Sequence, residues 1–348
     1  MPETAEPQVI VSVDNGLGRI ELNKPKAINA LGVDMINTVN EALGAWKDDD
    51  SVRAVLITGR GERGLCAGGD IKAIYKAITE GSEDNSKFFR HEYFMNYTLS
   101  EYPKPVIAVM NGITMGGGVG ISAHGSVRIV TDSTKIGMPE TTIGLFPDVG
   151  APHILARMPQ HVGMYLGLTG LPIGAGGAIA YGLADYYVPD ASVPELVKAL
   201  AENPGDVAEV VAQFAQDAPP AELTDDVSWI AECFAKDSPQ EIVEALRSHG
   251  SEKAQSTADL LETKSPRSVA VTFELIRRAA SLSLADVLEQ DLRTATNIAK
   301  YPDLTEGIRA QVIDKDRNPK WNPASLAEVD PQEVESIITT PVQDKVFS

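Results

Sequence analysis

The sequence predicts an α/β fold, a spiral of β-β-α turns followed by a C-terminal helical extension. Over roughly the first 190 residues, short strand patterns rich in β-branched residues alternate with helical patterns, and the connections between them are short. Beyond that point the strand patterns stop and amphipathic helical patterns follow one another. A chain of 348 residues is long enough for one large domain with such an extension.

The first part is predicted to begin with a β-hairpin, because Asn15-Gly16 separates two runs of β-formers. Apolar residues at helical spacing, from Leu31 to Trp46, predict the first helix. The predicted strands are residues 9–13, 18–22, 54–58, 106–110, 127–131 and 135–138. The predicted helices are residues 31–47, 70–78, 83–99 and 117–124.

The later part is predicted to be helical throughout, at residues 195–215, 222–235, 239–248, 251–263, 267–280 and 283–299. Ser238-Pro239 and Ser265-Pro266 are typical helix starts. We therefore expect a spiral core over 1–192, a helical extension over 193–325 and a loosely held polar tail over 326–348. The extension is expected to pack on the core, closing a pocket or forming a subunit interface; a separate binding module is the alternative.

The charge and the cysteines limit the classes of partner. The net charge is −19, which disfavours nucleic acid and anionic membranes as partners because both repel an acidic protein. Two cysteines far apart in sequence form no disulfide framework, and the five histidines lack metal-ligand spacing, so no metal is expected. No apolar run is long enough for a membrane helix. The acidic start of the sequence does not look like a targeting peptide, and these features together predict a cytoplasmic protein.

Two glycine-rich stretches follow predicted strands, at residues 64–71 (GLCAGGDI) and 111–120 (NGITMGGGVG). Backbone N–H groups at such a strand-to-helix turn have no intrahelical partner, and small residues let a ligand oxygen approach them. Two such groups from different loops would make an oxyanion hole. Tight turns and close packing explain glycines equally well, and neither stretch is a P-loop or a dinucleotide-binding fingerprint.

A third segment, residues 137–150 (GMPETTIGLFPDVG), places Glu140 and Asp148 in a mostly apolar stretch. Carboxylates are expensive to bury unless they are paired or used. The segment is therefore a candidate catalytic site, although buried carboxylates also cap helices.

The three segments, in this order and spacing, resemble the crotonase (enoyl-CoA hydratase/isomerase) superfamily. Within it the chain is most similar to the 3-hydroxyisobutyryl-CoA hydrolases, from about residue 9 to residue 325. The strings that carry the resemblance are FFRHEY, GITMGGGVGISAHG, MPETTIGLFPDVG and GIRAQVIDKDRNPKW. The resemblance implies a crotonase-like fold, an acyl-CoA substrate, no cofactor other than the coenzyme A of that substrate, and a homo-oligomer as one of the expected assembly states.

The resemblance also implies roles for individual residues. The oxyanion-hole donors fall on the backbone N–H groups of Ala67 and Gly117. The segment that lines the path of the coenzyme A falls on Gly68, Gly69 and Asp70.

The catalytic glutamate of the family falls on Glu140, the aspartate of the hydrolases on Asp148, and a glutamate that reaches the substrate on Glu92. Hydratases of the superfamily carry a second catalytic glutamate where this chain has Gly120. The expected activity is therefore hydrolysis of a short 3-hydroxyacyl-CoA, with 3-hydroxyisobutyryl-CoA of valine degradation as the first candidate. Glu140 would act as nucleophile or as general base. The alternatives are an enoyl-CoA hydratase or isomerase and a non-catalytic acyl-CoA-binding protein.

Overall fold

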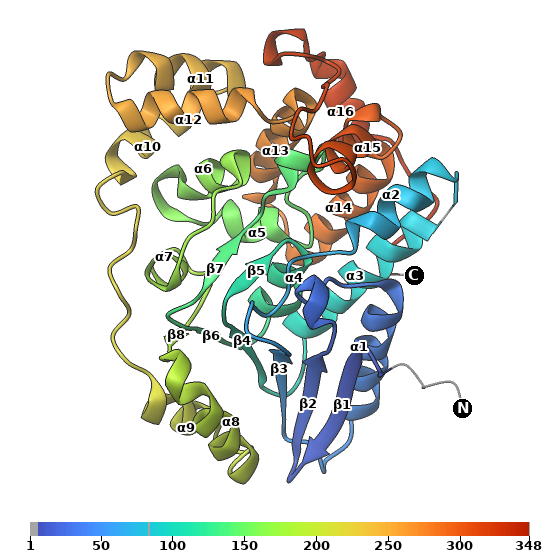
Figure 1. Cartoon of the computed structure of the whole chain (residues 1–348), viewed down its shortest axis with the longest axis vertical. Coiled ribbons are helices and arrows are strands. Elements are labelled where there is room, and N and C mark those ends of the chain that lie inside the picture. The colour runs from blue at the N-terminus through green and yellow to red at the C-terminus, as the bar shows by residue number, and fades with distance from the viewer. Residues whose placement is uncertain (1–5, 83, 348) are drawn as a thin grey trace. The chain divides into compact units, whose positions relative to one another are not determined.

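The computed structural model of the chain describes residues 6–82 and 84–347, and it has the predicted mixture of helices and strands (Figure 1). The chain forms two compact units that alternate along the sequence. We call the first the sheet unit, which comprises Met1–Gly69, Met95–Ile136 and Ile173–Ala221. The second, the helical unit, comprises Asp70–Phe94, Gly137–Pro172 and Glu222–Ser348.

The sheet unit begins with the predicted hairpin. Strands β1 (Val9–Asp14) and β2 (Leu17–Leu22) pair antiparallel. The two residues between them, Asn15 (φ 51°) and Gly16 (φ 93°), both have positive φ. A two-residue turn of this kind matches the twist of the flanking strands, which is why Asn-Gly predicts it.

The main sheet has six strands in the order β1-β2-β3-β4-β6-β8 (Figure 1). From β2 onward the neighbouring strands are parallel. The remaining strands of this sheet are β3 (Ala54–Gly59), β4 (Val106–Met110), β6 (Val127–Val130) and β8 (Tyr186–Tyr187). A second sheet pairs β5 (Ile113–Met115) with β7 (Lys135–Gly137). Because β3 and β4 are parallel neighbours, the loops that follow them leave the same edge of the sheet.

Helices bury one side of this unit's core. The apolar stripe predicted from Leu31 to Trp46 is buried on α1 (Val33–Trp46). The single helix predicted over 195–215 is instead two helices, α8 (Val193–Glu202) and α9 (Val207–Phe214). Pro204-Gly205 falls between them, and these residues end helices. Leu196, Leu200 and Val211 of this helix pair pack in one apolar cluster with the strands.

The helical unit contains α2, the first part of α3, the helices between Gly137 and Pro172, and the helices from α10 to the C-terminal region (Figure 1). The bounds of its longer helices are α2 (Ile71–Thr79), α3 (Asp84–Ser100), α6 (Val162–Thr169), α10 (Val227–Phe234), α11 (Pro239–Ser248), α12 (Glu252–Glu262), α13 (Pro266–Ala279), α14 (Leu284–Ile298) and α16 (Pro331–Thr339). Both predicted caps form: the Ser238 side chain accepts from Glu241 N–H and the Ser265 side chain from Ser268 N–H, each at 3.2 Å.

The observed division differs from the predicted boundary at residue 192. The helical extension from Glu222 onward shares a unit with 70–94 and 137–172, which lie inside the predicted core. The expectation of a loosely held tail is also wrong. Helix α16 buries Val334, Ile337 and Ile338, and Asn297 Nδ2 of α14 donates to the carbonyl oxygens of Ile337 (3.1 Å) and Thr340 (2.8 Å). Within residues 6–82 and 84–347, no helix is long and apolar enough to span a membrane.

Candidate functional site

The two glycine-rich loops of the sheet unit lie against each other. Isolated bridges join Gly64 to Gly112 and Cys66 to Thr114. The Leu65 N–H donates to Asn111 O at 2.9 Å. A Cβ at Gly118 would meet Cys66 O at 2.4 Å, so this close approach requires glycine.

One of the two predicted oxyanion-hole amides is already occupied. The Ala67 N–H donates to Ile28 O at 2.8 Å, so in this structure its proton is not available to a thioester oxygen. The N–H groups of Gly69 and Gly117 donate to no other group in the part of the chain that is described. A Cβ at Gly68, which has φ +111°, would lie 3.6 Å from Gly117 N, so the two turns are adjacent. The free pair of amides is therefore Gly69 and Gly117.

Asp70, predicted to line the coenzyme A path, caps helix α2. Its Oδ1 accepts from Ala73 N–H at 3.2 Å. A capping carboxylate at a helix N-terminus has a sufficient structural reason to be there.

The predicted carboxylates gather inside the helical unit. Glu140 opens the 3-10 helix η2 (Glu140–Ile143), Asp148 precedes α5 (Ala151–Leu155), and Glu92 lies on α3. The three side chains are only 7%, 5% and 2% exposed. Asp291 of α14, which is fully buried, joins them.

Burial and mutual repulsion raise the pKa values of these four carboxyls. Burial is the largest cause for Glu92, Glu140 and Asp291, and it holds all three pKa values well above the ordinary range. The nearby charge of Asp148 raises all three further, whereas the hydrogen bond from Gly150 N–H lowers the pKa of Asp291. The pKa of Asp148 rises only to about 6, because the Tyr93 hydroxyl stabilises its ionised form. The negative charge of the cluster near neutral pH therefore resides first on Asp148.

Three oxygens of the cluster are buried and lack a hydrogen-bond partner within the described residues: Glu92 Oε1, Glu140 Oε2 and Asp291 Oδ1. An unsatisfied buried polar atom costs about 1–3 kcal/mol, so such atoms are rare unless a ligand or water completes them. A ligand that brings hydroxyl groups or water to Glu92 and Glu140 would satisfy both.

Residues 17–338 match the model of the enoyl-CoA hydratase/isomerase family. The chain belongs to that family. It is 39% identical over 332 residues to the mitochondrial 3-hydroxyisobutyryl-CoA hydrolase of Xenopus tropicalis, a match that covers 93% of this chain and 86% of the relative. It is 38% identical over 328 residues to small ribosomal subunit protein mS47 of Schizosaccharomyces pombe. That match covers 90% of this chain and 76% of the relative.

Solved structures of the same family support the fold. A carnitinyl-CoA dehydratase from Mycobacterium thermoresistibile matches with a TM-score of 0.94 and 46% identity, covering 98% of each chain. An enoyl-CoA hydratase from Rhodobacter sphaeroides matches with a TM-score of 0.90 and 37% identity, covering 96% of this chain and 97% of that one. The predicted crotonase-type α/β fold is thereby confirmed.

The comparisons overturn the predicted location. Relatives from Xenopus tropicalis and Danio rerio are mitochondrial by name. The cytoplasmic location predicted from the sequence disagrees with these names and is withdrawn.

The sequence analysis did not identify two residues of the site, Tyr93 and Asp291. The Tyr93 hydroxyl donates to Asp148 Oδ2 at 2.6 Å, and Asp291 Oδ2 accepts from Gly150 N–H at 2.9 Å. Asp291 did leave a signal, because it lies between Val287 and Ala295 at four-residue spacing on the apolar face of its helix.

The turn that carries Asp148 is strained. Val149 has φ +53°, a conformation that β-branched residues avoid, and Gly150 follows with φ +76°. Strain of this kind costs about 1–3 kcal/mol and persists only where the surrounding structure imposes it. Here Asp291 holds Gly150, so the turn is fixed by the helical extension.

The extension also holds the segment that carries Glu140. Ser265 N–H donates to Thr141 O at 3.1 Å, and Lys264 Nζ donates to Thr142 Oγ1 at 2.7 Å. A Cβ at Gly144 would meet Asp303 O at 2.2 Å. The extension therefore contacts the segment that carries Glu140 and helps to build the carboxylate site.

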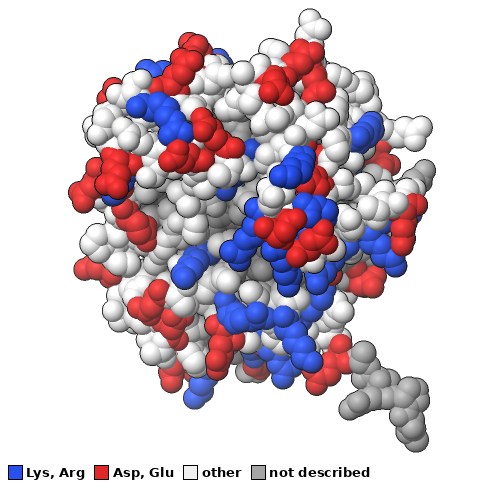
Figure 2. Space-filling model, turned by 45° about the horizontal axis from the view of Figure 1, so that its top comes forward, with Lys and Arg blue, Asp and Glu red and all other residues white. Residues whose placement is uncertain are grey.

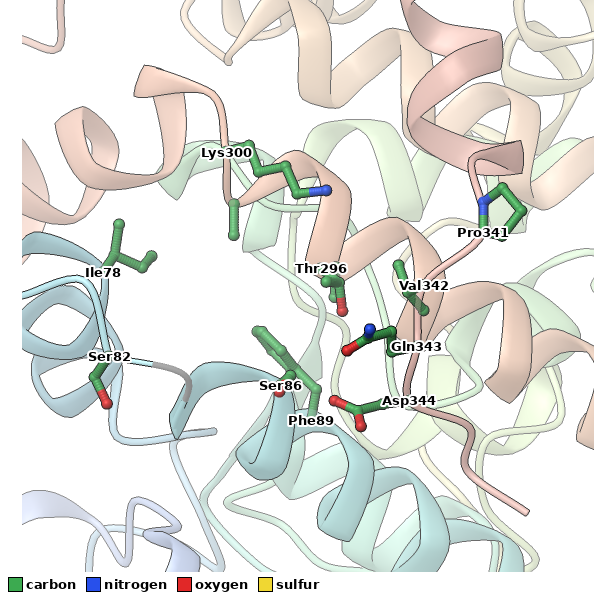
Figure 3. A pocket seen from close by; sticks show the side chains of 12 residues that line it. Ile78, Ser82, Ser86, Phe89, Thr296, Lys300, Pro341, Val342, Gln343 and Asp344 are labelled. Carbon is green, nitrogen blue, oxygen red and sulfur yellow. The ribbon is translucent and has the colours of Figure 1, made fainter. Parts of the chain in front are cut away.

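A cavity of about 520 Å³ lies in the helical unit between α2, α3, α14 and the segment after α16 (Figure 3). Lys300 and Asp344 line it, and Phe89 contributes an aromatic wall. None of the predicted site residues lines it, although Phe89 packs on Tyr93 with ring centroids 5.9 Å apart. Across the described ranges, no group of three or more His, Cys, Asp or Glu side chains is placed to hold a metal ion.

Proposed function

We propose that this protein hydrolyses a short 3-hydroxyacyl-CoA thioester to the free acid and coenzyme A. The observation that carries the proposal is the buried group of Glu92, Glu140 and Asp148. In this group, one oxygen of Glu92 and one of Glu140 have no hydrogen-bond partner within the described residues. A 3-hydroxyl and a water molecule supply hydrogen-bond donors. Relatives named 3-hydroxyisobutyryl-CoA hydrolase make 3-hydroxyisobutyryl-CoA, an intermediate of valine degradation, the first substrate to test.

The free amides of Gly69 and Gly117 are proposed to hold the thioester oxygen. Negative charge grows on this oxygen as the carbonyl is attacked, and fixed N–H donors stabilise it. The role first assigned to Ala67 passes to Gly69, because the Ala67 proton is used by Ile28.

Glu140 is proposed to supply the attack. As a nucleophile, its carboxylate adds to the carbonyl carbon, the C–S bond breaks, and the coenzyme A thiolate leaves and takes a proton. Water then hydrolyses the mixed anhydride and restores Glu140. As a general base, Glu140 takes a proton from the water that attacks directly. Neither route uses a cofactor beyond the coenzyme A of the substrate.

Asp148 and Glu92 are proposed to recognise the 3-hydroxyl. The charge of Asp148 opposes ionisation of Glu140. A substrate hydroxyl that donates to Asp148 weakens this repulsion and so favours the ionised, reactive form of Glu140. Acyl groups with a 3-hydroxyl should therefore react faster than those without one.

Basic residues beside the glycine loops fit the phosphates of coenzyme A. Lys and Arg side chains gather on the face in Figure 2, although the net charge is −19. In the sheet unit, Arg63 donates to the carbonyl oxygens of Pro25 and Lys26, both at 2.7 Å. This contact brings the basic residues of two loops together directly before Gly64.

A panel of short acyl-CoAs, with and without a 3-hydroxyl, tests the proposal by the rate of thiol release. We expect release to be fastest with 3-hydroxyacyl groups. Hydration of an enoyl-CoA without thiol release would instead support the enoyl-CoA hydratase activity named for the Rhodobacter sphaeroides relative. That outcome is disfavoured because helix α4 (Gly117–Ala123) carries Gly120, and no acid, where hydratases have their second glutamate.

Single turnover in ¹⁸O-water separates the two routes. Label in the Glu140 carboxylate supports the anhydride route with water attacking the glutamyl carbon. If the label appears only in the released acid, trapping with hydroxylamine decides: a hydroxamate on Glu140 supports the anhydride, and none supports the general-base route. A non-catalytic acyl-CoA-binding role predicts no thiol release with any member of the panel.

A further inference from the structure

The turn that carries Asp148 is held from two sides by residues distant in sequence. On one side the Tyr93 hydroxyl of α3 donates to Asp148 Oδ2 at 2.6 Å, across 55 positions of the sequence. On the other side Asp291 Oδ2 of α14 accepts from Gly150 N–H at 2.9 Å, across 141 positions. Asp148 O accepts from Ala151 N–H at 2.8 Å, which closes the turn itself.

Asp291 has no other visible reason to be buried. It is fully inaccessible, it lies on the buried face of α14, and its Oδ1 has no partner in the described part of the chain. A buried carboxyl is costly unless it serves a purpose. Its one hydrogen bond goes to the residue after Val149, whose φ of +53° an unrestrained chain would relax.

We propose that Asp291 and Tyr93 are positioning residues that act through Asp148. Asp291 fixes the strained turn, Tyr93 fixes the carboxylate plane, and Asp148 is thereby aimed at the substrate. The inference rests on the proposed hydrolase function, because thiol release is the activity measured.

The first experiment compares substitutions at Asp291 with matched substitutions at Asp286, an exposed carboxylate on the same helix. Asp291→Ala removes the acceptor, and we expect kcat to fall about 10-fold or more while KM changes less than about two-fold. Asp291→Asn keeps an oxygen that accepts from Gly150, so it should restore most of kcat. Asp286→Ala should leave kcat unchanged. Wild-type kcat in a folded Asp291→Ala variant would overturn the proposal.

The second experiment repeats the changes in an Asp148→Ala background, where no carboxylate is left to aim. Single-turnover measurements with enzyme in excess keep slow rates measurable. If Asp291 and Tyr93 act through Asp148, then Asp291→Ala and Tyr93→Phe cause no further loss in this background, although each lowers the rate of the wild type. Equal losses in both backgrounds would show a merely structural role and overturn the proposal.

Two further outcomes are kept distinct. If Asp291→Ala does not fold, as thermal unfolding would show, Tyr93→Phe in the two backgrounds decides the question alone. If the wild type releases no thiol from any acyl-CoA, the proposed function fails. If the wild type releases thiol and the Asp291 and Tyr93 variants are as active as the wild type, the proposed function is supported and the positioning roles are rejected.

Discussion

The sheet unit and the helical unit supply different chemistry by different means. In the sheet unit the candidate groups are main-chain amides, Gly69 and Gly117, on loops that follow neighbouring parallel strands. In the helical unit they are side-chain carboxyls brought together from α3, η2 and α14. Main-chain donors depend on the shape of two turns, whereas the carboxyls depend on packing between helices far apart in sequence. The two units should therefore respond differently to substitution.

The largest effect is expected in the helical unit, from Glu140→Gln. The amide cannot act as base or nucleophile, so kcat for thiol release should fall about 10²–10⁴-fold. Glu252→Gln, on an exposed position of α12, is the matched control and should be without effect. Unchanged hydrolysis by Glu140→Gln would remove the carboxylate from the mechanism while leaving the fold assignment intact.

The next largest loss of activity is expected in the sheet unit, from Gly117→Pro. Gly117 is the first residue of α4, a helix position that tolerates proline. Gly116 precedes it with φ 54° and ψ −121°, a backbone conformation with positive φ that glycine adopts freely. The substitution removes the N–H but also adds a ring at a buried position, so Gly117→Ala, which adds a Cβ and keeps the N–H, is the matched control. We expect a loss of about 10²–10³ in kcat with a similar unfolding temperature. A fully active, folded variant would show that this amide is no oxyanion donor.

A third prediction concerns stability rather than rate. Burial raises the pKa of Asp148 to about 6, from an ordinary value near 3.9. The folded state therefore holds the proton more tightly than the unfolded state, and stability is lost as pH rises from about 4 to about 6. Above this window, ionised Asp148 costs on the order of 3 kcal/mol.

Asp148→Asn removes that cost, so its stability relative to wild type should increase between pH 4 and pH 8. Thermal unfolding of both proteins across this range measures the difference. A difference that is constant with pH would show that Asp148 does not titrate in this way.

The smallest effect is expected from Gly44→Ala in α1 of the sheet unit. A Cβ there meets nothing within 4 Å, and alanine favours the helix, so stability should rise by about 0.5–1 kcal/mol with unchanged activity. Denaturant unfolding measures the gain. A loss of stability would mean that glycines of this unit are constrained even away from its loops.

Local patterns predicted the secondary structure well. Strand β4 and helix α11 have the predicted bounds, because a buried apolar run and a Ser-Pro cap are both local signals. The prediction failed where the tertiary structure decides. Nothing in the string CAGGD shows which amide is free, since this depends on a hydrogen bond from Ala67 to Ile28, 39 positions earlier.

The carboxylates of the site were predictable from a motif, but their supports were not. Glu140 and Asp148 stand within one long string that resembles a known family. Tyr93 and Asp291 reach Asp148 and its turn only through the packing of α3 and α14, which no sequence spacing encodes.

The interleaving of the two units has a consequence for synthesis on the ribosome. By the time Ala221 has been made, every segment of the sheet unit exists, whereas Asp291 is still 70 residues away. A nascent chain can therefore complete its β-structure early, but the Asp148 turn lacks its hydrogen bond to Asp291 until residue 291 has been made. The proposed thioester cleavage should therefore begin only after Asp291 has left the ribosome.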